Sequence, residues 1–133
     1  MMNYDQIVAD INNRVYKPLY FLMGEEPYFI DKITDLLASD VLAEEQKAFN
    51  LNILYGKDTD VNTIDSTARR FPMGAEYNLV IVREAQNLDD IDKLNFYAQS
   101  PLQSTILVIA YKYKTLDKRK KLYKTINKIK IAF

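Results

Sequence analysis

Hydrophobic positions along the chain follow two spacings that alternate from one end to the other. Short apolar runs predict strands at residues 19–23, 49–54, 79–82 and 105–110. Apolar residues three and four apart predict helices at residues 4–15, 29–41, 61–70, 88–98 and 116–129. A last run, at residues 130–133, is expected to begin a fifth strand. The pattern therefore predicts a chain in which strands and helices alternate.

Strands separated by helices predict a parallel sheet, because each helix carries the chain back to the starting edge of the sheet. The runs around Phe21, Val80 and Leu107 are apolar throughout, as in strands that are covered on both faces. The run at residues 49–54 partly alternates apolar and polar residues, which places it at a sheet edge. We expect an α/β fold, a three-layer sandwich around a parallel five-stranded sheet.

Composition narrows the chemistry of this fold. The 133 residues include no cysteine and no histidine, which excludes disulfides, thiol nucleophiles, the usual zinc ligands and the commonest general base. No apolar run approaches the ~18 residues needed to cross a bilayer, and the N-terminus lacks the regions of a signal peptide. We expect one cytoplasmic domain with no membrane contact, cofactor or metal site.

The loop after the first strand is where a phosphate-binding loop would lie in such a sheet. That loop needs glycines whose amides face the phosphates, a Lys for their charge and a Ser or Thr for magnesium. Residues 24–31 contain one glycine, no Lys, Ser or Thr, and the sequence Glu25-Glu26-Pro27. The carboxylates repel phosphate, and proline has no amide donor. We expect a degenerate nucleotide site without catalysis, in which Glu25 and Glu26 cap a helix.

A second class of function remains open at this point. The loop after the third strand begins with Arg83 and Glu84, without the aspartate that would hold magnesium in a working nucleotidase. A receiver domain would need an acidic pair after its first strand, a central aspartate and a late lysine. Glu25, Glu26 and Lys112 fill two of these roles, but the aspartate is missing. The alternative is therefore a degenerate receiver-like or P-loop NTPase-like domain that acts as a protein interaction module.

Charge is spread unevenly, although the net charge is zero. Residues 112–133 hold nine of the 18 basic residues and one of the 18 acidic residues. Such a segment either contacts nucleic acid phosphates or forms a solvated helix face. The candidate phosphate contacts are Lys118, Arg119, Lys120 and Lys121. Contacts of this kind would be insensitive to base sequence.

Several of these segments together resemble the N-terminal domain of the delta subunit of bacterial DNA polymerase III, a clamp-loader component. The first is the strand and loop at residues 18–30, which include Gly24-Glu25-Glu26-Pro27. The others are residues 71–74, 79–85, 105–108 and the basic stretch 116–122. No single motif is diagnostic, but their order, their spacing and the degenerate first loop are similar to the family.

The resemblance implies an AAA+-like domain at residues 1–133 that binds and opens the DNA polymerase sliding clamp in replication and does not hydrolyse ATP. The lid and collar domains through which such subunits meet other loader subunits are absent from this chain. The family contacts the clamp with apolar residues before the central strand, which correspond here to Phe71, Pro72 and Met73. The aromatic residue precedes Pro72, so the register departs from the family pattern. The alternative for Phe71 is a place in the core.

Overall fold

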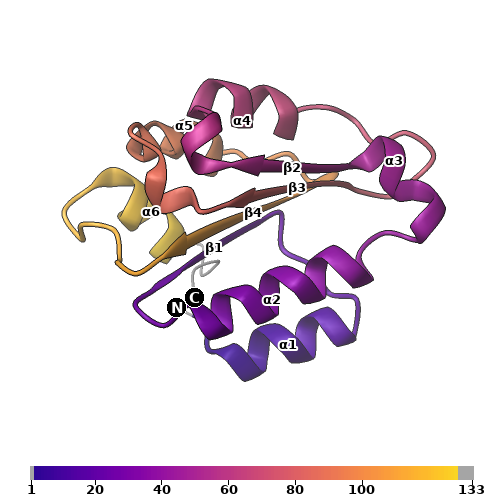
Figure 1. The fold of residues 1–133 in the computed structure, drawn as a ribbon, viewed down its shortest axis with the longest axis horizontal. Coiled ribbons are helices and arrows are strands. Elements are labelled where there is room, and N and C mark those ends of the chain that lie inside the picture. The colour runs from indigo at the N-terminus through magenta and orange to yellow at the C-terminus, as the bar shows by residue number, and fades with distance from the viewer. Residues whose placement is uncertain (1, 129–133) are drawn as a thin grey trace.

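Four parallel strands form the sheet of the computed structural model, which describes residues 2–128 (Figure 1). In chain order they are β1 (Leu19–Gly24), β2 (Leu51–Tyr55), β3 (Asn78–Arg83) and β4 (Thr105–Lys112). Their order across the sheet is β1-β4-β3-β2, so β2 is an edge strand, as its alternating sequence predicted. In the central pairs Phe21 lies opposite Ile109, and Ile81 opposite Val108.

Helices cover both faces of the sheet and produce the three layers seen in Figure 1. One face carries α1 (Tyr4–Asn12) and α2 (Pro27–Asp40), and the other carries α4 (Val61–Ala68), α5 (Asn95–Ala98) and α6 (Lys121–Lys128). The short helices are η1 (Glu44–Gln46), α3 (Lys47–Asn50), η2 (Gly56–Asp58), η3 (Ala85–Asn87) and η4 (Ile91–Leu94). Successive strand residues enter opposite cores, because side chains alternate across a strand. Phe21 packs with the α4 layer, whereas Tyr20 and Leu22 pack with α1 and α2.

The sheet corrects the expectation of five strands, because its described part has four. The segment 130–133, expected to supply the fifth strand, lies outside the described residues. The second strand also begins later than predicted, since residues 49 and 50 belong to α3. The Asn50 side chain bonds to the main chains of Gln46 and Met73, which ends α3 at this residue.

Two predicted helices are shorter than their apolar spacing indicated. The one expected at residues 88–98 forms as η4 and α5, after Asp90 as the N-cap. The one expected at residues 116–129 begins at Lys121. Before it, the Asp117 carboxylate accepts the backbone N–H of Arg119 at 2.9 Å, and such a local side-chain contact favours a turn over a helix.

Strand order also bears on the receiver-like alternative. A flavodoxin-like sheet has the order 2-1-3-4-5, with β1 between β2 and β3. In this chain β1 pairs with β4, and β2 pairs with β3. The topology therefore does not support a receiver-like domain.

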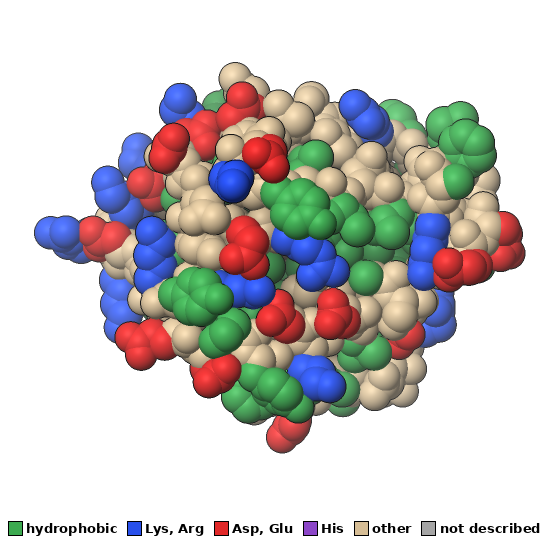
Figure 2. All heavy atoms as spheres, viewed as in Figure 1, with side chains coloured by type: hydrophobic (Ala, Val, Ile, Leu, Met, Phe, Trp, Pro, Cys, Tyr) green, Lys and Arg blue, Asp and Glu red, His purple; other side chains and the backbone are tan. Residues whose placement is uncertain are grey.

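Surface side chains gather by type at the two ends of the molecule. In Figure 2, Lys and Arg side chains crowd the left end, where the chain after β4 and α6 lie in Figure 1. Hydrophobic side chains project at the right end, near α3 and the loop that follows α4. None of the helices within residues 2–128 is long and apolar enough to cross a membrane.

Candidate functional site

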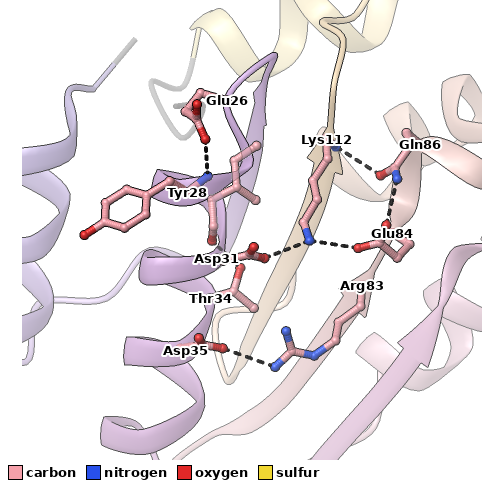
Figure 3. A network of polar contacts seen from close by, with 10 residues as sticks. Glu26, Tyr28, Asp31, Thr34, Asp35, Arg83, Glu84, Gln86 and Lys112 are labelled. Carbon is pink, nitrogen blue, oxygen red and sulfur yellow. Dashed lines mark hydrogen bonds and ion pairs between the residues drawn. The ribbon is translucent and has the colours of Figure 1, made fainter.

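The carboxyl edge of the sheet, where ligands bind in open α/β folds, is occupied by ion pairs of the chain itself. Lys112 ends β4, and its Nζ lies 2.8 Å from Asp31 Oδ1 and 2.8 Å from Glu84 Oε2 (Figure 3). The Gln86 amide donates to Glu84 Oε1 at 3.0 Å and accepts the backbone N–H of Lys112 at 3.0 Å. These four side chains thus pair with one another within the chain.

Lys112 is the most buried member of these pairs, whereas the Asp31 and Glu84 side chains are 44% and 38% exposed. The Lys112 side chain is 13% exposed. This burial acts to lower the pKa of Lys112, but the hydrogen bonds to Asp31 and Glu84 outweigh it and raise the pKa. The hydrogen bond from Lys112 lowers the pKa of Glu84. The ammonium therefore stays charged and balances the two carboxylates at the end of the sheet.

The first loop makes several contacts within the chain itself. Glu26 is the N-cap of α2, and its carboxylate accepts the backbone N–H of Tyr28 at 3.0 Å. The predicted capping role is thus confirmed for Glu26, whereas Glu25, exposed like Glu26, is not the cap residue. The chain after β4 turns back to form an antiparallel bridge between Lys114 and Gly24. An amide donor that a phosphate would need is therefore already used by a carboxylate.

We expect Mg-ATP to leave the stability of the protein unchanged, because carboxylates and internal pairs fill the edge where a triphosphate would lie. Thermal unfolding with and without excess Mg-ATP tests this. A ligand at a hundredfold excess over its dissociation constant adds ~2.7 kcal/mol to the free energy of unfolding, which gives a visible shift in Tm. An upward shift of that size would contradict the prediction.

We expect the contribution of the Lys112 pairs to depend on pH. Since the folded pKa of Glu84 is lowered, its stabilisation is fully present above the pKa of the unfolded chain and is lost as the pH falls through the folded value. Urea unfolding should therefore show a gap between wild type and Lys112→Met at pH 6 that narrows by pH 3. The control Lys118→Met removes an exposed lysine and should show no such narrowing. A gap that is constant with pH would refute the prediction.

At the opposite, amino edge of the sheet, the loop between α4 and β3 presents apolar side chains to solvent. Phe71 is 75% exposed and Met73 is 66% exposed, and Pro72 between them is half-buried. The core alternative for Phe71 is therefore wrong. The structure brings all three predicted residues into one short loop, beside Gly74, which has a φ of 66°. A left-handed backbone of this kind favours glycine and turns the chain sharply after Met73.

Buried polar side chains anchor the start of this loop. Asn78, the first residue of β3, donates from Nδ2 to the carbonyl oxygens of Thr67 at 3.0 Å and Arg70 at 3.2 Å. Thr105, the first residue of β4, donates from its hydroxyl to the carbonyl of Ala68. These contacts satisfy carbonyls that the end of a helix leaves without partners. The end of α4 is thus tied to two strands, and Phe71 follows directly from it.

Phe49 is a third exposed apolar residue at this edge, and sequence reasoning missed it. It lies on α3 and is 73% exposed. The next residue, Asn50, contacts the main chain of Met73, so α3 lies against the loop. The hydrophobic group at the right end of Figure 2 coincides with this edge. No local signal distinguished Phe49 from a strand residue, because the apolar-polar alternation of 49–54 runs through it. We name Phe49, Phe71 and Met73 the apolar edge.

The predicted phosphate contacts lie at the other end of the molecule and are all exposed. Two of them already pair with carboxylates: Arg119 Nη2 lies 2.8 Å from Asp117 Oδ2, and Lys120 Nζ lies 3.9 Å from Asp92 Oδ2. The pairing with Arg119 lowers the pKa of Asp117 to about 2. Among the described residues, Lys118 and Lys121 form no ion pair. The structure therefore leaves two of the four predicted cations free for an external anion.

The grouping of the acidic side chains bears on metal binding. Within residues 2–128, no three acidic residues gather in a way that could hold a metal ion. The carboxylates at the carboxyl edge, Asp31 and Glu84, share Lys112 as their counter-charge. The apolar edge offers no charged group of its own. Its chemistry suits contact with an apolar surface of another macromolecule.

The chain is similar to known proteins both in its sequence and in its structure. Residues 20–133 match the family described as DNA polymerase III, delta subunit. The chain is 31% identical over 121 residues to DNA polymerase III subunit delta of Bacillus subtilis strain 168, covering 84% of this chain and 35% of that protein. The structure resembles the B. subtilis DNA clamp loader delta protein with a TM-score of 0.81 at 26% identity, covering 95% of this chain and 40% of that one.

A more distant likeness concerns the fold alone. A DNA polymerase III gamma subunit-related protein from Thermotoga maritima matches with a TM-score of 0.62 at 14% identity, over 96% of this chain and 43% of that one. The chain therefore spans well under half the length of each of these relatives. Because the family match covers all but the first 19 residues, the chain belongs to the DNA polymerase III delta subunit family.

Proposed function

We propose that this chain is the AAA+-like N-terminal domain of a clamp-loader delta subunit, which binds and opens the DNA polymerase sliding clamp without hydrolysing ATP. The observation that carries the proposal is the exposure of Phe71 and Met73 on a loop tied to the sheet. Large apolar side chains held in solvent are typical of residues that enter a pocket on a partner. Pro72 between them restricts the backbone and lowers the entropy lost on binding.

Opening of the clamp follows from differential binding. A subunit that binds the open clamp more tightly than the closed clamp shifts the clamp population toward the open form. No nucleotide chemistry is needed in this domain for that shift. The internal pairs of Lys112 support this view, because they occupy the edge that a nucleotide would use.

Titration of a bacterial sliding clamp with the chain tests the proposal. A fluorophore pair placed across a subunit interface of the clamp should report saturable binding and an increased separation. Both signals should be the same with and without Mg-ATP. Absence of binding would refute the function, and binding without a change in separation would remove the opening step.

Contact with DNA phosphates is a second proposal, carried by the free cations Lys118 and Lys121. The face of α6 that holds Leu122 and Ile126 is buried, which turns Lys121 to solvent. Two phosphate contacts predict weak binding with a slope of log K against log salt of roughly −2. Fluorescence anisotropy with two duplexes of unrelated sequence should give equal affinities that vanish at moderate salt. A strong preference for one duplex would contradict contact through phosphates alone.

A further inference from the structure

The side chain of Asn50 binds the main chain of the loop that carries Phe71 and Met73. Asn50 is 1% exposed, at the end of α3. Its Oδ1 accepts the backbone N–H of Met73 at 2.7 Å, and its Nδ2 donates to the Met73 carbonyl at 2.8 Å. The same Nδ2 group donates to the Gln46 carbonyl at 2.9 Å. One buried amide therefore binds both main-chain groups of a residue that lies 23 positions away in the sequence.

The main chain of this loop makes few other hydrogen bonds, although Ala75 and Tyr77 pack against the core. Among the described residues, no backbone–backbone hydrogen bond joins residues 71–77 to each other or to the rest of the chain. Besides Asn50, a side-chain contact to this main chain comes from Gln46, whose Nε2 lies 3.4 Å from the Gly74 carbonyl. The side-chain amide of Asn50 bonds to both the N–H and the C=O of Met73, as a neighbouring strand would. Asn50 thus supplies the two hydrogen bonds that a strand neighbour would otherwise make.

The burial of Asn50 makes its two hydrogen bonds to Met73 costly to break. Because Asn50 is shielded from water, its amide loses its partners if the loop moves away, and unpaired buried polar groups are costly. Gly74, next in the chain, has a left-handed backbone and could otherwise adopt many conformations. The two hydrogen bonds therefore select one loop conformation, in which Met73 is exposed.

We propose that Asn50 is a positioning residue that presents Met73 and Phe71 to the clamp by fixing the Met73 main chain. This inference rests on the proposed clamp-binding function. Asn50 contributes through the loop and not by touching the partner, because its own side chain is buried. Its removal should therefore reduce affinity only as far as Phe71 and Met73 contribute to binding.

Hydrogen exchange tests the tether without any partner. Asn50→Leu fills a similar volume with an apolar side chain and removes all three hydrogen bonds. In this variant the Met73 amide should exchange at least about tenfold faster than in wild type. The control Asn95→Ala removes an asparagine of α5 whose side chain accepts the Thr125 hydroxyl and does not touch the loop or its anchors. In that control the Met73 amide should exchange at the wild-type rate. Unchanged protection in Asn50→Leu would overturn the tether.

Clamp titration with the full chain then tests the consequence. Asn50→Leu should weaken clamp binding about tenfold under conditions where urea unfolding shows the protein to be folded, because the free loop must be ordered on binding. In a Phe71→Ala, Met73→Ala background the same change should have less than about a twofold effect. An undiminished tenfold effect in that background, or wild-type affinity of Asn50→Leu, would overturn the inference.

A second Asn50 variant and the double alanine variant distinguish failure of this inference from failure of the proposed binding site. If Asn50→Leu does not fold, Asn50→Asp replaces it, because aspartate keeps the acceptor for the Met73 N–H and loses the donor to the Met73 carbonyl. Affinity should then fall about threefold, and wild-type affinity would overturn the inference. If the Phe71→Ala, Met73→Ala chain binds the clamp as wild type does, the proposed binding site fails. The exchange result still decides whether Asn50 fixes the loop.

Discussion

Replacing Met73 with alanine should weaken clamp binding at least roughly thirtyfold, since truncating an apolar anchor typically costs ~2 kcal/mol or more and ~1.4 kcal/mol is a factor of ten. The free energy of unfolding should stay nearly unchanged, because the side chain is exposed. Phe71→Ala should behave in the same way, as its exposure excludes a core role. Titration of the clamp and urea unfolding of each variant measure the two quantities.

Phe96→Ala is the matched control for Phe71→Ala. Phe96 lies on α5 and is 80% exposed, so the same chemical change is made away from the apolar edge. Clamp affinity should change less than about twofold in this variant. Equal losses for Phe71→Ala and Phe96→Ala would indicate a non-specific hydrophobic effect. Wild-type affinity in both Phe71→Ala and Met73→Ala would remove the apolar edge as the clamp contact.

Gly56→Ala should destabilise the protein by at least ~2 kcal/mol, because an added methyl group has no room. A Cβ at Gly56 would lie 2.1 Å from the carbonyl oxygen of Glu84 and 2.9 Å from its carbonyl carbon. Both are backbone atoms, so no side-chain rotation relieves the contact. The shift would also move the Glu84 carboxylate that pairs with Lys112. Urea unfolding of the variant measures the loss.

Gly74→Ala separates steric contact from backbone strain. A Cβ at Gly74 would meet open space, but its φ of 66° is unfavourable for alanine. The expected loss is ~1 kcal/mol, smaller than for Gly56→Ala. The reverse order, with Gly74→Ala the more destabilising, would show that the region around Gly56 can relax.

The apolar pattern predicted a strand or helix correctly wherever the spacing of its own residues decides whether it forms. The strand predicted at residues 105–110 is apolar from Ile106 onward and forms one of the two central strands, β4. The alternating run at 49–54 forms the edge strand β2. Prediction was less accurate where side chains compete with regular structure, as at Asn50 and Asp117, since a local hydrogen bond ends or delays a helix without changing the apolar spacing.

For the candidate site too, the sequence predicted some features and left others undecided. The sequence, with its family resemblance, predicted Phe71, Pro72 and Met73 as the clamp contact, and the carboxylates Glu25 and Glu26 predicted a loop unsuited to phosphate. It could not decide whether Phe71 is buried, because a helix end before a strand can face either the core or solvent. The exposure of Phe71 is set by how Asn78 and Thr105 bind the end of α4.

By itself, the sequence determined the α/β class and the edge position of β2, and it predicted a loop unsuited to phosphate, because each follows from residue types and their spacing within one segment. Only the tertiary structure decided that Lys112 pairs with Asp31 and Glu84, that Asn50 holds Met73, and that Phe49 joins the apolar edge. The ion pairs of Lys112 and the hydrogen bonds of Asn50 to Met73 join residues between 23 and 81 positions apart. Their geometry depends on strand order and register, which place distant segments side by side and which no local spacing encodes.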